Sequence, residues 1–345
     1  MRAAWVVKAV ALLAVFSVAF FNCASTAKTS SASGNLVSGP DVQSGGDDLG
    51  PVGPLRLSYR SGDFGTLERQ FEELNASGVH DSVKCYAYYI MGQMSLKRDD
   101  YQEALRFFAM VPDKHPDYLF ARHAAAIACA MSDDERCTMD NLGLVIEGKP
   151  KNNAQKEIIN RSYVFLGFLY YENLSIENAL ARAVTALRKV PKESVHYQDA
   201  LLGLGWTALK SRQWGDCVKI GEELAKVADD SLFRSEGNLL HAYALAMQKN
   251  YTRSVALLDE ALQRVSSYTG PSDEELAANR GNEYEYKGQI FFSRDIEQFK
   301  DDAEIARARF ARFAVVSGAR NSAPKSSNVD EDEIEKLRKM FEEAE

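Results

Sequence analysis

The chain has 345 residues, of which 46% are hydrophobic, enough apolar side chains for a folded core of ordinary size. Its formal net charge is −8, which argues against a broad nucleic-acid-binding surface, because such surfaces are strongly basic. No internal run reaches the roughly 18 apolar residues that indicate a membrane-spanning helix.

The amino-terminal segment has the pattern of a secretory signal peptide. Arg2 and Lys8 precede the run Ala9–Phe21, which is apolar apart from Ser17. A short basic start followed by an apolar stretch of roughly 7–15 residues is typical of such a signal. We therefore predict a signal peptide over residues 1–22.

Cys23 stands directly after this run and resembles the lipid-attachment Cys of a bacterial lipoprotein signal. The resemblance implies that Cys23 receives diacylglycerol and becomes the first residue of the mature protein. Phe20, Phe21 and Asn22 depart from the usual residues before that Cys and resemble the looser signals of spirochaetes and some other phyla. The alternatives are ordinary cleavage near Ser25 or Ala27, or an uncleaved anchor.

Residues 23–54 are rich in Ser, Gly, Thr and Pro, a composition that predicts a flexible tether. Leu55–Ser77 has the apolar spacing of the later half of a helical repeat, so we expect a lone capping helix there. A full first helix before it is excluded, on this interpretation, by the Gly and Pro residues of Gly50–Pro54.

The stretch Cys85–Pro116 carries small and aromatic residues at fixed spacing. Counted from Cys85 as position 1, the residues at positions 4, 7, 8, 20, 24 and 32 are Tyr88, Met91, Gly92, Ala104, Phe108 and Pro116. This pattern resembles the tetratricopeptide repeat (TPR) family, whose two-helix hairpins recur about every 34 residues. Ser95, where Tyr is usual, is the clearest departure.

The same frame returns at residues 119, 160, 198 and 235, and the copy from Asn160 is the second strong match. The resemblance covers about residues 55–263 and implies an all-α, right-handed solenoid of about five TPR hairpins plus capping helices. We expect the extra residues to lie between repeats, in loops such as Lys151–Asn153. Small residues at positions 8 and 20 imply close helix packing, so Gly167 should face Ala179.

The resemblance also implies which residues line the concave surface. These are Tyr86, Tyr89, Gln93, Phe120, His123, Ile127, Arg161, Phe168, Tyr171, Trp206, Tyr243 and Met247. The set is mainly aromatic and apolar, and it lacks the Lys, Asn and Arg pattern of TPRs that clamp chaperone carboxylates. We expect an apolar binding groove. The alternative is that a tight superhelix, or the C-terminal helices, make these residues part of the core.

Residues 264–316 are expected to form a helical cap of two helices, at about 273–294 and 300–316. Ile305, Phe310 and Phe313 of the second should point inward. A Pro- and Ser-containing linker is predicted at 317–328.

The last segment, residues 329–345, predicts an acidic amphipathic helix with eight acids against three bases. Ile334, Leu337, Phe341 and Ala344 share one face. An isolated helix of this length is marginal in water, so the apolar face needs a partner. We expect it to dock into the protein's own groove, and the alternative is another protein.

Two motifs resemble nucleotide-binding sequences but lack the residues or the structural setting that such a site needs. Gly143–Lys149 spells a P-loop, but Pro150 replaces its Ser or Thr, and Gly203-x-Gly205 lies within a predicted helix. The five histidines have no metal-binding spacing. We therefore expect no metal, no cofactor and no enzymatic activity.

Cys129 and Cys137 are the only cysteine pair that we consider for a disulfide. We favour free thiols, because Cys129 falls on a packing position where a small apolar side chain fits.

The leading hypothesis is a non-enzymatic TPR scaffold or adaptor, lipid-anchored on the periplasmic side of the bacterial envelope, which binds a peptide segment or protein partner. We favour the outer over the inner membrane. The alternative is a TPR lipoprotein that partners a periplasmic solute-binding or TRAP-type transport system and holds a small apolar ligand. An enzyme on a helical scaffold ranks third.

Overall fold

The computed structural model describes residues 50–228, 231–266 and 293–322, and these contain helices and loops but no strand. The predicted signal peptide, Cys23, most of the tether, most of the helix predicted at about 273–294, and the acidic tail lie outside the described residues. The predicted all-α class is confirmed.

In the part of the chain that the structure describes, six helical hairpins follow one another. They are α2 (Gly53–Arg60) with α3 (Phe64–Ala76), α4 (Asp81–Lys97) with α5 (Tyr101–Ala109), α6 (Tyr118–Met131) with α7 (Glu135–Ile146), α8 (Asn153–Glu172) with α9 (Ala179–Leu187), α10 (Tyr197–Lys210) with α11 (Trp214–Val227), and α12 (Ser231–Met247) with α13 (Tyr251–Ser266). The long helix α15 (Ser293–Ser322) packs on α13 and α12.

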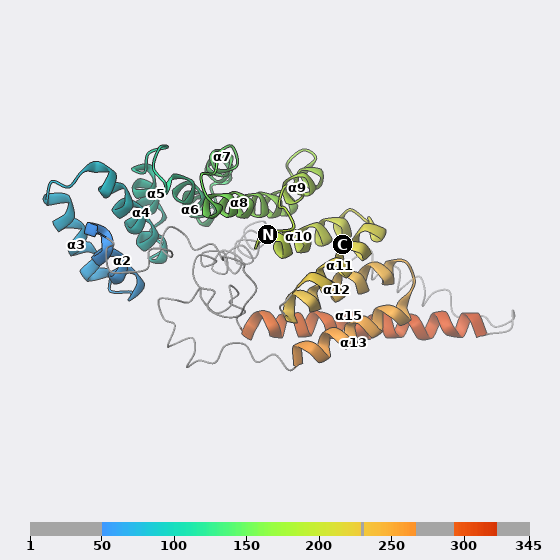
Figure 1. Cartoon of the computed structure of the whole chain (residues 1–345). Helices are drawn as coiled ribbons and strands as arrows, with labels where there is room; N and C mark the ends of the chain where they lie inside the picture. The colour runs from blue at the N-terminus through green and yellow to red at the C-terminus, as the bar shows by residue number, and fades with distance from the viewer. Residues whose placement is uncertain (1–49, 229–230, 267–292, 323–345) are drawn as a thin grey trace.

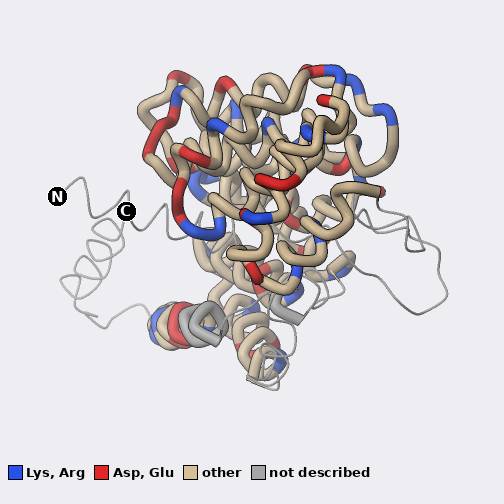
Figure 2. The backbone as a smooth tube through the Cα atoms, turned by 90° about the vertical axis from the view of Figure 1, so that its left-hand side faces the viewer, with Lys and Arg blue, Asp and Glu red and all other residues tan. Residues whose placement is uncertain are grey.

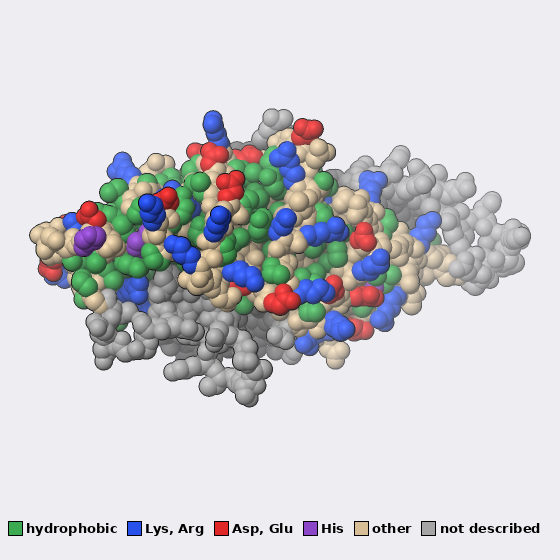
Figure 3. All heavy atoms as spheres, turned by 45° about the horizontal axis from the view of Figure 1, so that its top comes forward, with side chains coloured by type: hydrophobic (Ala, Val, Ile, Leu, Met, Phe, Trp, Pro, Cys, Tyr) green, Lys and Arg blue, Asp and Glu red, His purple; other side chains and the backbone are tan. Residues whose placement is uncertain are grey.

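The hairpins stack into two layers of a helical-repeat solenoid (Figure 1). Each helix packs on its neighbours in the chain, and the first helices α4, α6, α8, α10 and α12 also pack on one another. We call these five helices the inner layer. The second helices form the outer layer, and on the face in Figure 3 hydrophobic atoms are broken up throughout by Lys and Arg side chains.

A shared turn joins the two helices of most hairpins. Its second residue has a positive φ and stands two residues before the second helix, and the residues in this place are Gly62, Asp99, Asp133, Arg212 and Lys249. The next residue is often an acid that caps the helix: the side chain of Asp100, for example, accepts a hydrogen bond from the Glu103 N–H at 3.1 Å. A helix N-cap thus recurs at one position of the repeat.

The fourth hairpin, α8 with α9, departs from this plan, because its turn contains the six residues 173–178 instead of three. Leu187 therefore follows Gly167 by 20 residues, whereas Phe108 follows Gly92 by 16. A Cβ atom added at Gly167 would lie 2.5 Å from Leu187 Cγ. The prediction that Gly167 faces Ala179 is wrong, because extra residues lie inside this hairpin and not only between repeats.

The amino-terminal hairpin is complete, so the prediction of a lone helix after a tether ending at residue 54 is wrong. A short 3-10 helix, η1 (Gly50–Val52), leads into α2, which buries Leu55. Pro54 lies in the first turn of α2, where a missing N–H costs no helical hydrogen bond. The Gly and Pro residues therefore start this helix instead of excluding it.

At the other end, α15 is one continuous helix that extends through Ser322, into the predicted linker. It buries Phe299, Ala303, Ala306 and Phe310 against α12 and α13. Ile305 is 51% exposed, so its predicted inward orientation is wrong, since five helical residues separate it from Phe310 by about 140°. Figure 2 looks roughly along α13 and α15, which lie below the rest of the described chain.

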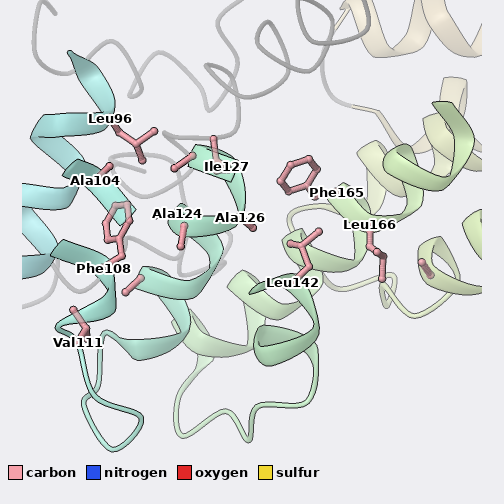
Figure 4. Packing of buried hydrophobic residues seen from close by; sticks show 14 residues of the cluster. Leu96, Ala104, Phe108, Val111, Ala124, Ala126, Ile127, Leu142, Phe165 and Leu166 are labelled. Atoms are coloured by element: carbon pink, nitrogen blue, oxygen red, sulfur yellow. The ribbon is translucent and has the colours of Figure 1, made fainter. Parts of the chain in front are cut away.

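The core is built between consecutive hairpins. In the largest cluster, Phe108 from α5 packs with alanines of α6, while Leu142 and Leu166 continue the cluster toward α8 (Figure 4). Gly92 makes room for the Phe108 ring, because a Cβ atom there would lie 2.5 Å from it. Position 8 of the repeat is small for this reason, as predicted.

The structure joins Cys129 of α6 to Cys137 of α7 by a disulfide, with 5.6 Å between the Cα atoms. The favoured prediction of free thiols at this pair is therefore wrong. The short turn places Cys137 in the first turn of α7, directly opposite the last turn of α6. Cys85 and Cys217 are free and buried.

Candidate functional site

The residues predicted to line the concave surface all lie on the inner layer. They come from α4 (Tyr86, Tyr89, Gln93), α6 (Phe120, His123, Ile127), α8 (Arg161, Phe168, Tyr171), α10 (Trp206) and α12 (Tyr243, Met247). Because adjacent inner helices pack on one another, the structure brings equivalent positions of successive hairpins side by side. The predicted set is therefore spatially continuous across the hairpins.

Five members of this set are buried: Gln93, Phe120, His123, Ile127 and Arg161. Phe120 packs in a cluster with Ile158 and Val145, and Ile127 belongs to the large core cluster. For these five residues the structure supports the alternative, in which they are part of the core. An open apolar groove over α6 is not what the described chain presents.

Three aromatic side chains remain half-buried at position 9 of the repeats that start at residues 160, 198 and 235, on three successive inner helices. They are Phe168 of α8, Trp206 of α10 and Tyr243 of α12, and we call them the aromatic row. Tyr243 meets Phe310 of α15 edge-on, with 5.5 Å between ring centroids. The α15 end of the row is thus covered, and Trp206 stands at its centre.

Tyr171 and Lys210 lie about one turn beyond the aromatic row on α8 and α10. Lys210 Nζ sits 4.1 Å from the centre of the Tyr171 ring and donates a hydrogen bond to the Tyr171 carbonyl oxygen at 2.9 Å. Burial, together with nearby Glu172, raises the pKa of Tyr171 to about 12. Lys210 is itself exposed, so this pair puts a positive charge beside the aromatic row.

The amino-terminal end of the inner layer is closed by packing. Tyr86 meets the His115 ring at 4.3 Å between centroids, and Tyr89 is tilted against Phe108 at 6.1 Å. Arg56 of α2 lies above the Tyr86 ring at 6.0 Å. These half-buried tyrosines therefore serve mainly to join the first hairpins. Met247, at the far end, is 40% exposed.

Between α8 and α10 lies a group of buried polar residues that the sequence analysis did not predict. Glu157 Oε2 accepts a hydrogen bond from Ser194 Oγ at 2.5 Å, and Ser194 Oγ accepts one from the His196 N–H at 3.1 Å. His196 Nδ1 is 3.5 Å from a carboxylate oxygen of Asp199. The turn after Pro191 places these groups, and a turn of this kind has no strong sequence signature.

His123 has a defined tautomer. Ser162 Oγ donates to the Ile158 carbonyl oxygen at 2.8 Å, so it accepts from the Nδ1–H of His123, also at 2.8 Å. Burial, then the charges of Arg161 and His196, hold the pKa of His123 well below 6.5, so the ring is neutral at pH 7. The Ser162 hydroxyl hydrogen is already used, and this pair is not arranged as a nucleophile with its general base.

The Gly203–Gly205 motif lies inside a helix, as expected from the sequence, and the P-loop-like motif begins in a helix that ends at Ile146. Gly143 is inside α7, and Gly203 and Gly205 are inside α10, where a Cβ atom at Gly205 would lie 2.5 Å from Leu240. Close packing explains that glycine. Within the described residues, no three His, Cys, Asp or Glu side chains are grouped so that they could hold a metal ion.

Comparison with known proteins adds no identification: no protein-family model matches the chain, and no curated protein matches its sequence. Of the helices in residues 50–322 that the structure describes, none combines the length and apolar character needed to cross a bilayer.

Proposed function

We propose that this protein is a non-enzymatic scaffold that binds a peptide segment or a protein partner along its inner layer. The observation that carries the proposal is the aromatic row, three large aromatic side chains at one position of adjacent helices. Aromatic side chains dominate the energy of many protein interfaces, since they bury much area at little cost in conformational entropy. The stacking of hairpins places them along one line, which suits an extended or helical segment.

We further propose that the scaffold resembles TPR lipoproteins and is anchored by lipid at Cys23, on the periplasmic side of the bacterial envelope. The basic start, apolar run and Cys23 support the anchor. The Cys129–Cys137 disulfide supports an oxidising compartment, because reducing cytosol disfavours such bonds. Both observations point to the same side of the membrane.

Site-specific photocross-linking in cells tests the binding surface. A photoreactive amino acid at Lys210, one turn after Trp206, should cross-link to an envelope protein. The matched control is Lys219 on α11 of the same hairpin, whose side chain is 80% exposed and lies in the outer layer. Position 219 should give no product with that partner.

Each contrary outcome has its own meaning. Equal cross-linking from positions 210 and 219 would show that the partner does not use the inner layer. If neither position captures a protein, and organic solvent extracts a hydrophobic compound from the purified protein, the scaffold hypothesis gives way to the alternative in which a small apolar ligand is held. Lys210→Glu provides a second readout of partner binding, because it reverses the charge beside the aromatic row at an exposed position.

A further inference from the structure

Helix α15 presents a second stripe on the face opposite its core contacts. The stripe consists of Ile305, Ala308, Arg312 and Val315, all exposed, with Ile305 at 51% and Val315 at 72%. Successive members are three, four and three residues apart, the spacing of a coiled-coil seam. We call this stripe the outer seam. A seam of this kind, apolar apart from Arg312, is expected to bind another helix.

The sequence after α15 supplies a matching helix pattern. Its apolar face consists of Ile334, Leu337, Phe341 and Ala344, again three, four and three residues apart. Only residues 323–328 separate α15 from this segment. A connection of six residues is an ordinary length between two antiparallel helices.

We propose that residues 329–345 fold back as an antiparallel helix onto the outer seam of α15. With the segment reversed, both stripes fall into register as four layers. The layers pair Val315 with Ile334, Arg312 with Leu337, Ala308 with Phe341, and Ile305 with Ala344. Phe341 meets an alanine and Ile305 meets an alanine, so large side chains face small ones.

Charge favours the same arrangement. Residues 305–322 carry four bases and no acid: Arg307, which is already paired with Asp259 of α13, and Arg309, Arg312 and Arg320. Residues 329–345 carry eight acids and three bases. Attraction between the two segments therefore adds to the apolar contact. Arg312 can lay its aliphatic stem along Leu337 while its charged end reaches the acids that flank the seam.

Other positions for the tail fit less well. The inner layer, which the sequence analysis favoured, has five of its twelve predicted lining residues buried. The outer-layer face has its apolar atoms interrupted by charge (Figure 3). A second copy of the chain could cover the outer seam only in competition with a tethered segment, whose effective concentration is of millimolar order.

Disulfide cross-linking in the full-length chain tests the register. All variants carry Cys23→Ser, and the remaining free thiols Cys85 and Cys217 are buried. Val315→Cys with Ile334→Cys should oxidise within one chain, seen as a mobility change on a non-reducing gel. The control pairs Val315→Cys with Ala344→Cys, which the proposed register holds at opposite ends of the seam. We expect about tenfold slower oxidation of that pair.

Three results would overturn the proposal: no cross-link in the first pair, equal cross-linking in both pairs, or dimers formed by Val315→Cys alone. The last result would assign the outer seam to a second copy. Ile334→Asp gives a readout that needs no cross-link. It should increase the binding of a hydrophobic dye, whereas Glu343→Lys, off the apolar face, should not. Light scattering should find a monomer in every case.

Discussion

Gly221 of α11 and Gly237 of α12 meet where the two helices cross, and each leaves no space for a side chain on the other. A Cβ atom added at Gly221 would lie 2.7 Å from the carbonyl oxygen of Gly237. One added at Gly237 would lie 2.7 Å from the Gly221 oxygen and from the Ala225 nitrogen. The obstructing atoms are backbone, so relief requires that the helices move apart.

Gly237→Ala should therefore lower the free energy of unfolding by about 2 kcal/mol, the usual range for overpacking a close contact. Denaturant unfolding measures the change. The matched control is Gly215→Ala in α11, where an added Cβ atom meets nothing within 4 Å. That variant should be neutral or gain ~0.5 kcal/mol, because alanine suits a helix better than glycine. Equal effects at both sites would contradict the crossing.

Gly167 and Leu187 allow a sharper test of the α8/α9 hairpin. Gly167→Ala alone should destabilise by about 1–3 kcal/mol, because its Cβ atom would collide with Leu187. Leu187→Ala alone should also destabilise, since it empties a fully buried site. In the double variant the new methyl group fills part of that space, so the total loss should be smaller than the sum. A strictly additive double-mutant cycle would show that the two residues do not touch.

Most of the fold was predictable because the small residues of the first helices keep their positions in the repeat. Gly92, Gly167 and Gly205 stand at the predicted position 8, and each meets a large side chain, Phe108, Leu187 or Leu240. The second helices were harder to place. The core does not restrict the length of the turn within a hairpin. From the sequence, the longer turn before Ala179 could therefore not be distinguished from a longer linker after the repeat.

The candidate site was predicted less well than the fold. Repeat position identifies which residues face the inner layer, but burial depends on the size of the neighbours. Phe120 is 8% exposed because Ile158 and Ile159 pack against it, whereas Trp206 stays half-buried. The hydrogen bond between Glu157 and Ser194 joins residues 37 positions apart, a distance at which spacing patterns carry no information.

Loss of the Cys129–Cys137 disulfide should destabilise the α6/α7 hairpin. The bond closes a short loop, and loop-closure entropy for this length corresponds to about 2.5 kcal/mol. A reducing agent should lower the unfolding midpoint of the native protein. It should leave the midpoint of the Cys129→Ala/Cys137→Ala variant unchanged, which controls for the thiols of Cys85 and Cys217. An unchanged native midpoint would argue against the bond.

The buried histidines should make the protein less stable as the pH drops below about 6.5, opposed by Glu236, whose pKa burial raises to about 7. Burial lowers the pKa of His115, His123 and His241 in the folded protein below the ordinary value of 6.5. The unfolded chain therefore binds protons first, and the stability present above pH 6.5 is progressively lost as the pH decreases. His123→Asn removes one of the three titrations while keeping a donor near Ser162. The urea midpoint at about pH 5.5, taken relative to that at about pH 7.5, should be higher in this variant than in the native protein.

Lipid attachment at Cys23 makes the location of the protein testable. Cys23 follows an apolar run with a basic start, and thioether linkage to diacylglycerol requires its thiol. Cys23→Ser removes the attachment point. If the signal is still cleaved, the protein should move from the membrane fraction to the soluble periplasmic fraction and should lose incorporation of a labelled fatty acid.

Asn22→Ser, a change beside the cysteine that preserves it, serves as the control and should keep both the label and the membrane location. Unchanged labelling of the Cys23→Ser protein would place the lipid elsewhere. A Cys23→Ser protein that stays in the membrane without label would indicate that the apolar run Ala9–Phe21 remains as the anchor.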